Sequence, residues 1–231
     1  MKRALLLVCL FALCNLTLLA QTGKVPRAAH TTEKSKIHVA PQEAPAGSQK
    51  IFSNLGPNRF NLYNDTFGWP VTGPNTVEDA PLTGQESVGM PFTPNSNAQV
   101  SQVRLALQYI SGGEVFYVSI YGDSGGRPGT LLAGPVTLTH LPLFGTCCTL
   151  AVAHFDPPLP VTGETQYWVV ASTPTTGKGS DSSGFWDWVY QDDIPPVFLP
   201  GVFGLIEDPG DFGFFNFEQP GDAAAAFEVL D

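Results

Sequence analysis

Cysteine is scarce in this chain of 231 residues, which contains only four. Cys9 and Cys14 lie in an apolar N-terminal stretch, so Cys147 and Cys148 are the only cysteines after it. Two adjacent cysteines cannot form the many-bridged framework on which small secreted domains depend. The fold must therefore rest on a hydrophobic core, and a domain of about 180 residues can bury around 70% of its unfolded surface.

Positive charge is scarce after residue 50. Residues 51–231 contain four basic and nineteen acidic side chains, a net charge of −15, whereas residues 21–50 contain five basic and two acidic ones, a net charge of +3. Such an acidic domain repels nucleic acid and anionic membrane surfaces, so we expect neither as a partner. Its charge favours solubility, cation binding or a basic partner.

Long apolar runs are missing beyond the N-terminus, which itself has the pattern of a secretory signal. Lys2 and Arg3 precede the apolar run Ala4–Ala20, and hydrophilic residues follow at once. This order is typical of a signal peptide that is cleaved on export. We expect cleavage after Ala20, a mature chain without a membrane span, and a secreted protein that is extracellular or periplasmic.

The rest of the chain divides into two regions. Residues 21–50 are rich in Pro, Ala, Ser, Thr and Lys and have few large apolar side chains, so burial cannot offset the entropy lost on ordering. We expect a flexible basic linker at 21–50, after the signal peptide at 1–20. Residues 51–231 are expected to form one acidic domain.

Alternation of apolar and polar residues predicts an all-β domain. In the run 100–109, Val103, Leu105 and Leu107 share one face with Tyr109, and the intervening residues share the other. Turn residues recur about every ten positions, which favours an antiparallel β-sandwich or jelly roll. The expected strands are 87–92, 100–109, 115–121, 130–141, 149–155, 166–172, 184–191 and 225–230.

The segment Gly122–Gly126 matches the sequence around the nucleophile of chymotrypsin-like proteases, and His154 follows it. In those proteases the histidine precedes the serine, and a triad is defined by spatial roles that a short string cannot establish. A strand-connecting turn explains the same glycines. We therefore expect no catalytic residue here and no enzyme activity.

Acidic residues near the C-terminus offer hard oxygen ligands of the kind that Ca²⁺ takes. The candidate ligands are Asp208, Asp211 and Asp222, although the regular spacing of a known calcium loop is missing. Solvated acidic turns explain the same pattern. Apart from this Ca²⁺ site, we expect no cofactor.

Alternating aromatic residues form the most prominent candidate for a binding surface. Trp186, Trp188 and Tyr190 share one face of an expected strand. If exposed, that face is a stacking platform for sugar rings or a partner protein, and if turned inward it is core.

Cys147 and Cys148 leave two alternatives open. Adjacent Cα atoms lie ~3.8 Å apart, closer than the ~4.4–6.8 Å usual for disulfides, so a vicinal bridge is strained. Export to an oxidising compartment favours the bridge, and Gly145 supplies a turn that helps to close it. We expect a vicinal disulfide without a catalytic role, and two buried free thiols are the alternative.

Several segments together resemble the secreted bacterial domains labelled choice-of-anchor R, over roughly residues 51–190. These segments are Ile51–Pro57, Gly68–Gly73, Met90–Pro94, Val103–Tyr109, Gly125–Gly129, Phe144–Cys148 and Gly163–Trp168. The resemblance implies an exported domain to which no enzyme activity is assigned. Since Phe227–Asp231 carries no sorting motif or apolar helix, we expect no anchor here.

These observations favour a non-catalytic secreted or cell-surface domain that binds a carbohydrate or a surface protein. One alternative is a structural component of an extracellular matrix. A polysaccharide-directed hydrolase is another, and it would need two carboxyl groups facing each other across a cleft. Fold class alone does not decide between these functions.

Overall fold

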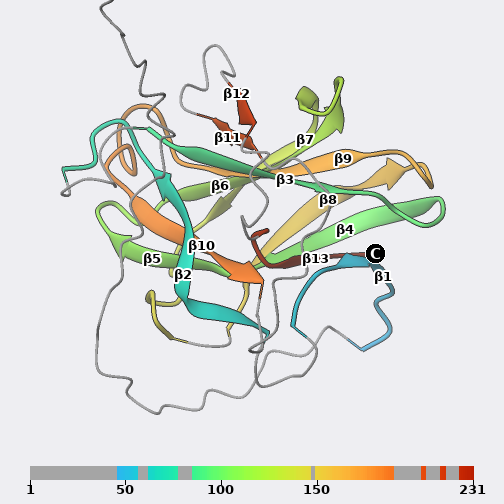
Figure 1. Ribbon diagram of the computed structural model, residues 1–231, viewed down its shortest axis with the longest axis horizontal. Coiled ribbons are helices and arrows are strands. Elements are labelled where there is room, and N and C mark those ends of the chain that lie inside the picture. The colour runs from blue at the N-terminus through green and yellow to red at the C-terminus, as the bar shows by residue number, and fades with distance from the viewer. Residues whose placement is uncertain are drawn as a thin grey trace, which may run out of the picture.

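The computed structural model describes residues 46–56, 62–77, 85–146, 149–189, 204–206, 214–216 and 224–231. Within these ranges the chain is all-β, and its strands form three antiparallel sheets consistent with a β-sandwich (Figure 1). The expected fold class is thereby confirmed. In the same ranges, no helix has the length and hydropathy required to cross a membrane.

A four-stranded sheet has the order β1-β13-β4-β8. Its strands are β1 (Lys50–Ser53), β13 (Phe227–Leu230), β4 (Ala98–Leu105) and β8 (Ala151–Val161). Lys50 pairs with Leu230, and the main-chain N–H of Gln49 donates to Asp231 Oδ1 at 2.5 Å. Ordered structure therefore reaches into the last residues of the segment expected to be a flexible linker.

A three-stranded sheet has the order β2-β10-β5. Its strands are β2 (Tyr63–Thr72), β10 (Ser183–Val189) and β5 (Leu107–Ser111). Asp187 pairs with Gly68, but the next residue, Trp188, pairs with Asn64. Residues 65–67 therefore form a three-residue bulge in β2.

A six-stranded sheet has the order β12-β11-β3-β9-β6-β7 and occupies the upper part of Figure 1. Its strands are β12 (Phe214–Asn216), β11 (Gly204–Ile206), β3 (Ser87–Phe92), β9 (Tyr167–Ser172), β6 (Phe116–Asp123) and β7 (Pro128–Leu138). β7 lies at one edge of this sheet, as β8 does in the four-stranded sheet. The position of these two edges determines where the candidate site lies.

The expected single strand 100–109 is divided at Ala106 into β4 and β5. Ala106 N–H donates to Ala226 O at 3.0 Å, and Ala106 O accepts from Asp187 N–H at 2.9 Å, so this residue connects the two smaller sheets. Both faces of β4 and β5 are covered from solvent. Arg104 of β4 is 2% exposed, and Gln108 of β5 is fully buried. The face on which alternation predicts exposed polar residues is therefore buried as well. Its polar side chains form hydrogen bonds within the protein and not with water.

The core lies between the six-stranded sheet and the two smaller ones. Side chains from all three sheets belong to one buried cluster, including Leu105 of β4, Val118 of β6, Val169 of β9 and Trp186 of β10. A separate small cluster of Trp168 and Val170, with Tyr121 packed against it, contains other residues of β9 and β6. Strand alternation thus buries apolar residues on two faces of the six-stranded sheet.

Candidate functional site

At the centre of β10, the face that carries Trp186 and Trp188 points into the core. Trp186 is fully buried, its indole N–H donates to Ala226 O at 2.9 Å, and its ring meets Phe227 edge to face at 5.7 Å between centroids. Of the two alternatives for this face, an exposed stacking platform or core, the second holds for Trp186, because the three-stranded sheet turns this residue into the core.

The neighbouring aromatic residues of that face also pack on the protein itself. Trp188 is half-buried, stacks on Phe67 at 5.6 Å and lies tilted to Trp69 at 5.6 Å between ring centroids. Tyr190 lies outside the described residues. The described part of this face therefore resembles core packing more than an open platform.

Five other candidate residues lie outside the described part of the chain. They are the calcium ligands Asp208, Asp211 and Asp222, and the cysteines Cys147 and Cys148. Among the residues that the structure does describe, no three His, Cys, Asp or Glu side chains are grouped so as to hold a metal ion. The calcium site and the vicinal disulfide remain predictions.

The Gly122–Gly126 segment connects β6 to β7 and is organised around Asp123. Asp123 Oδ1 accepts from Trp168 Nε1 at 2.8 Å and from Gln166 Nε2 at 2.7 Å, while Oδ2 accepts from the N–H of Gly126 at 3.1 Å. Partial burial acts to raise the pKa of Asp123, but these hydrogen bonds outweigh it and lower the pKa.

Ser124 is exposed in this turn, where its N–H donates to Arg127 O at 2.8 Å. Gly125 and Gly126 have φ of +66° and +79°, which glycine adopts without strain. His154 lies on β8, in a different sheet, with its ring 3.3 Å from Gln102 Nε2. The geometry therefore agrees with a turn that orders the end of the β6–β7 hairpin.

A groove opens where the sheet edges β7 and β8 face each other. On β8, Leu159 pairs with Val100 and His154 with Gln102, so residues 155–158 bulge out of the ladder with β4. On β7 the register with β6 shifts between Val136 and Ala133. Bulges of this kind bend a strand away from its neighbour and are frequent at sheet edges and binding sites.

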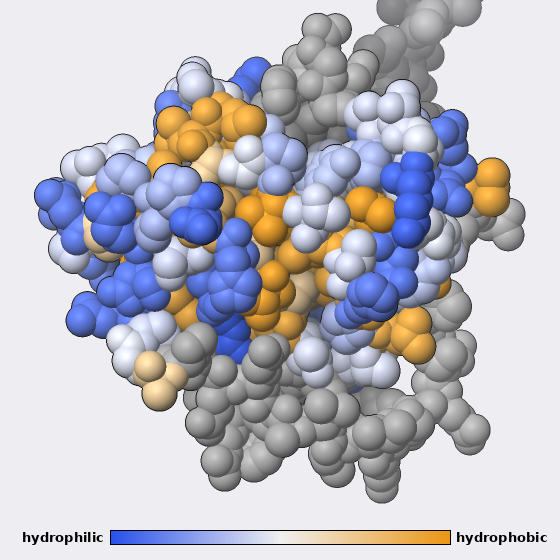
Figure 2. All heavy atoms as spheres, turned by 180° about the vertical axis from the view of Figure 1, so that it is seen from behind, coloured by the Kyte–Doolittle hydropathy of each residue, from blue (hydrophilic) through white to orange (hydrophobic). Residues whose placement is uncertain are grey.

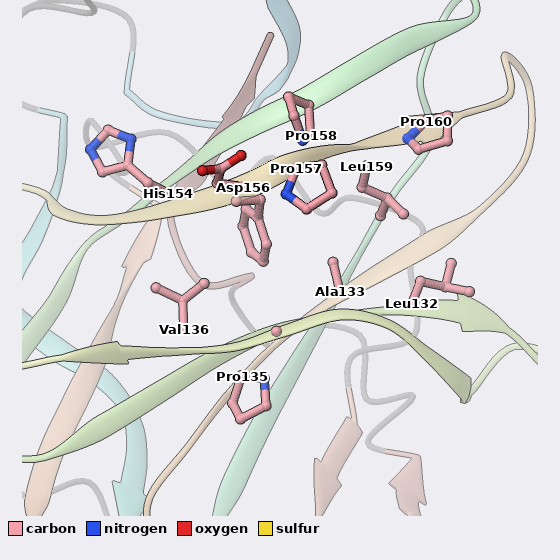
Figure 3. A pocket seen from close by; sticks show the side chains of 12 residues that line it. Leu132, Ala133, Pro135, Val136, His154, Asp156, Pro157, Pro158, Leu159 and Pro160 are labelled. Atoms are coloured by element: carbon pink, nitrogen blue, oxygen red, sulfur yellow. The ribbon is translucent and has the colours of Figure 1, made fainter.

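The groove has a volume of about 590 Å³ and is lined by residues 132–136 of β7 and 154–160 of β8. In Figure 3, Val136 and Ala133 point from β7 toward β8, and Leu159 points from β8 into the space between the strands. His154 and Pro158 point away from it. Phe155, only 5% exposed, connects the lining to the core.

Proline is concentrated in the groove walls. Pro157, Pro158 and Pro160 lie on β8 and Pro135 on β7. A proline has no main-chain N–H, so these positions offer carbonyl acceptors but cannot donate to an added strand. Prolines at a sheet edge work against pairing with the edge of another sheet.

Large apolar side chains reach the surface beside the groove. Leu131 and Leu132 of β7 are 45% and 42% exposed. Seen from behind, hydrophobic residues form a band through the middle of the described surface, with hydrophilic residues on both sides (Figure 2). The charged or ionisable lining residues are His154 and Asp156, both exposed, and no lysine or arginine is among the lining residues.

Comparison of the sequence with protein-family models and with curated proteins finds no match.

Alternation and spacing did not reveal the groove. The available signal was the run of prolines at positions 157, 158 and 160, because proline inside a strand indicates an edge or a bulge. What the sequence could not show is that a second proline-bearing edge, β7, would lie opposite this one.

Proposed function

We propose that this chain is a non-catalytic, exported β-sandwich domain that binds an extended apolar segment of another protein in the groove between β7 and β8. The observation that carries the proposal is the groove itself, which lies between two bulged strands and is lined by apolar side chains. Export is inferred from the signal-like N-terminus and from the resemblance to choice-of-anchor R domains.

The groove suits a peptide better than a sugar. Residues 132–136 of an extended strand span roughly 15 Å, enough for about five residues of an extended ligand. Sugar rings stack on exposed aromatic faces, yet Phe155, the aromatic residue of the lining, is 5% exposed. The exposed leucines match the apolar side chains of a peptide.

The lining also supports a function without catalysis. It contains one carboxylate, Asp156, and one imidazole, His154, whose ring lies beside Gln102. Hydrolysis of polysaccharides ordinarily needs two carboxyl groups about 5–10 Å apart across the scissile bond. The lining of this groove offers one carboxyl group, which favours binding over hydrolysis.

The proposal is tested by selecting ligands from a displayed library of short random peptides and measuring their affinities by fluorescence anisotropy. We expect the selected peptides to be apolar, and Leu132→Asp or Leu159→Asp to weaken binding at least tenfold. Leu143→Asp is the matched control, because Leu143 is 59% exposed but lies outside the groove lining.

Two results would contradict this function. One is equal peptide affinity in the groove variants and the wild-type protein. The other is selective binding to an array of polysaccharides that survives both groove substitutions, since that would place a carbohydrate site elsewhere on the domain.

A further inference from the structure

The basic segment before the domain contains one short apolar stretch. Val25, Ile37 and Val39 are the aliphatic side chains larger than alanine in residues 21–45, which lie outside the described residues. Ile37 and Val39 are both β-branched and two positions apart, so an extended backbone places them on the same face. We refer to the five residues around this pair, 36–40, as the 36–40 segment.

The groove between β7 and β8 matches the 36–40 segment in length and in chemistry. Its β7 wall, residues 132–136, is also five residues long, and its volume of about 590 Å³ lies within the ~300–1,000 Å³ of ligand pockets. Val136 points toward β8, and Leu159 points into the space between the strands (Figure 3). Leu132 of the lining is 42% exposed. Two β-branched side chains would therefore meet apolar walls along the whole groove.

The charges on the two sides are also complementary. The lining contains the exposed carboxylate Asp156 and no lysine or arginine, and residues 51–231 carry a net charge of −15. Lys34 and Lys36 lie directly before the apolar pair, in a region whose net charge is +3. Opposite charges beside an apolar contact favour encounter and fix orientation.

Strand register places the start of β1 level with the groove. One row of paired residues crosses the four-stranded sheet from β1 to β8 and consists of Lys50, Leu230, Gln102 and His154. Neighbouring strands lie ~4.8 Å apart, so about 14 Å separates the first residue of β1 from the first groove residue of β8.

The chain before β1 is long enough to cover this distance and leaves the sheet in the right direction. β1 and β8 run in opposite directions, so the residues that precede Lys50 leave β1 toward the level of residues 155–160. About ten residues connect the 36–40 segment to Lys50, and an extended chain of that length spans roughly 33 Å. Pro41 and Pro45 in this connection favour extended backbone. The 36–40 segment can therefore reach the groove of its own molecule.

We propose that the 36–40 segment binds in the groove of its own molecule and that an outside peptide must displace it. This inference rests on the proposed function, because it assigns an internal competitor to the same groove. A tethered segment is present at an effective concentration of the order of mM, so even weak intrinsic binding keeps it in the groove. The apparent affinity for an outside peptide falls by the fraction of molecules whose groove is open.

A labelled peptide with the sequence of residues 34–41 tests the proposal, with binding to the full chain measured by fluorescence anisotropy. The wild-type groove already holds the same sequence, so a protein with Ile37→Asp and Val39→Asp should bind the peptide about tenfold more tightly. Val25→Asp is the matched control, because Val25 is an aliphatic residue of the same region outside the 36–40 segment. Its affinity should equal that of the wild type.

The outcomes separate this proposal from the proposed function. Equal affinities of the wild type and the double variant would overturn the internal competitor. Failure of the 34–41 peptide to bind, while peptides selected from the library still bind the groove, would overturn it and leave the proposed function standing. A dimer that disappears in the double variant, detected by analytical ultracentrifugation, would overturn it by placing the segment in the groove of a second molecule.

Limited trypsin digestion measures the bound segment without an added peptide. A protease cleaves a segment that is free of its binding site, so the bond after Lys36 should be cut several times more slowly in the wild type than in Leu132→Asp. Cleavage after Arg27 is the internal control and should proceed at the same rate in both proteins. Leu159→Asp provides the same comparison if Leu132→Asp does not fold. Equal rates after Lys36 in the wild type and the groove variant would overturn the proposal, whether or not any outside peptide binds.

Discussion

Arg104 and Glu228 form a buried ion pair between neighbouring strands. Arg104 Nη1 donates to Glu228 Oε1 at 2.5 Å, the two residues are directly opposite each other on β4 and β13, and each side chain is 2% exposed. Lys50 Nζ approaches the other oxygen, Oε2, at 3.6 Å but is 61% exposed. The pair connects the C-terminal strand to the middle of the four-stranded sheet.

Removing one member of this pair should destabilise the domain strongly. Arg104→Leu leaves Glu228 buried without its main partner, and we expect the free energy of unfolding to fall by about 3–5 kcal/mol. Lys50→Ala should cost less than ~1 kcal/mol, because exposed pairs contribute little. Urea unfolding measures the free energy that each substitution removes. Equal losses would contradict the prediction, which rests on the difference in burial between the two contacts.

Replacing Trp186 should affect stability and leave ligand binding intact. Because its side chain is fully buried and donates to Ala226 O, Trp186→Ala should lower the free energy of unfolding by about 3–5 kcal/mol. The affinity of the folded variant for groove peptides should equal that of the wild type. A folded Trp186→Ala protein that loses its ligand would instead show that this residue contributes to a binding surface.

The stability of the domain should decrease as the pH rises, because of one buried carboxyl group. Burial raises the pKa of Asp187 well above its usual range, and the charge of Asp65 adds to the rise. The folded state then holds the proton more tightly than the unfolded state, so its stabilisation is complete below the unfolded pKa of about 3.9 and declines until the pH passes the folded pKa.

Asp187→Asn should remove this part of the pH dependence. The amide cannot ionise, so the variant should gain stability relative to the wild type as the pH rises from 5 to 8.5, measured by urea unfolding. Parallel pH profiles for the two proteins would show that Asp187 keeps an ordinary pKa in the folded state.

Ser124 should not behave as an enzyme nucleophile. It lies exposed in a turn ordered by Asp123, and the histidine next in sequence, His140, lies after β7 and 3.1 Å from Thr139 Oγ1. A fluorophosphonate probe labels serines that a neighbouring base activates, so we expect no labelling of the intact protein. Labelling that disappears in Ser124→Ala would demonstrate an active site.

Two of the expected strands match the structure closely. Residues 87–92 form β3 with the predicted bounds, and 166–172 differs from β9 by one residue. β2 was missed because Asn64, Gly68 and Pro70 interrupt its pattern, yet pairing with β10 holds it in the sheet. Tertiary contacts here override local propensity, as is common for strands.

The candidate sites were harder to predict for a related reason. Whether Trp186 faces solvent depends on which side of its sheet meets the core, and alternation shows only that the two sides differ. The groove depends on bulges, which shift register at positions that no spacing rule in a single sequence marks.

The pairing of β1 with β13 determines how the domain responds to mechanical force. Lys50 and Leu230 are cross-strand neighbours, so the chain enters and leaves the domain at the same end of one two-strand ladder. Tension applied at residues 49 and 231 would act on the hydrogen bonds at one end of that ladder first and break them one after another. The force would not be shared by all the hydrogen bonds of the ladder at once. Under tension between these two points, β1 and β13 are the first strands to separate.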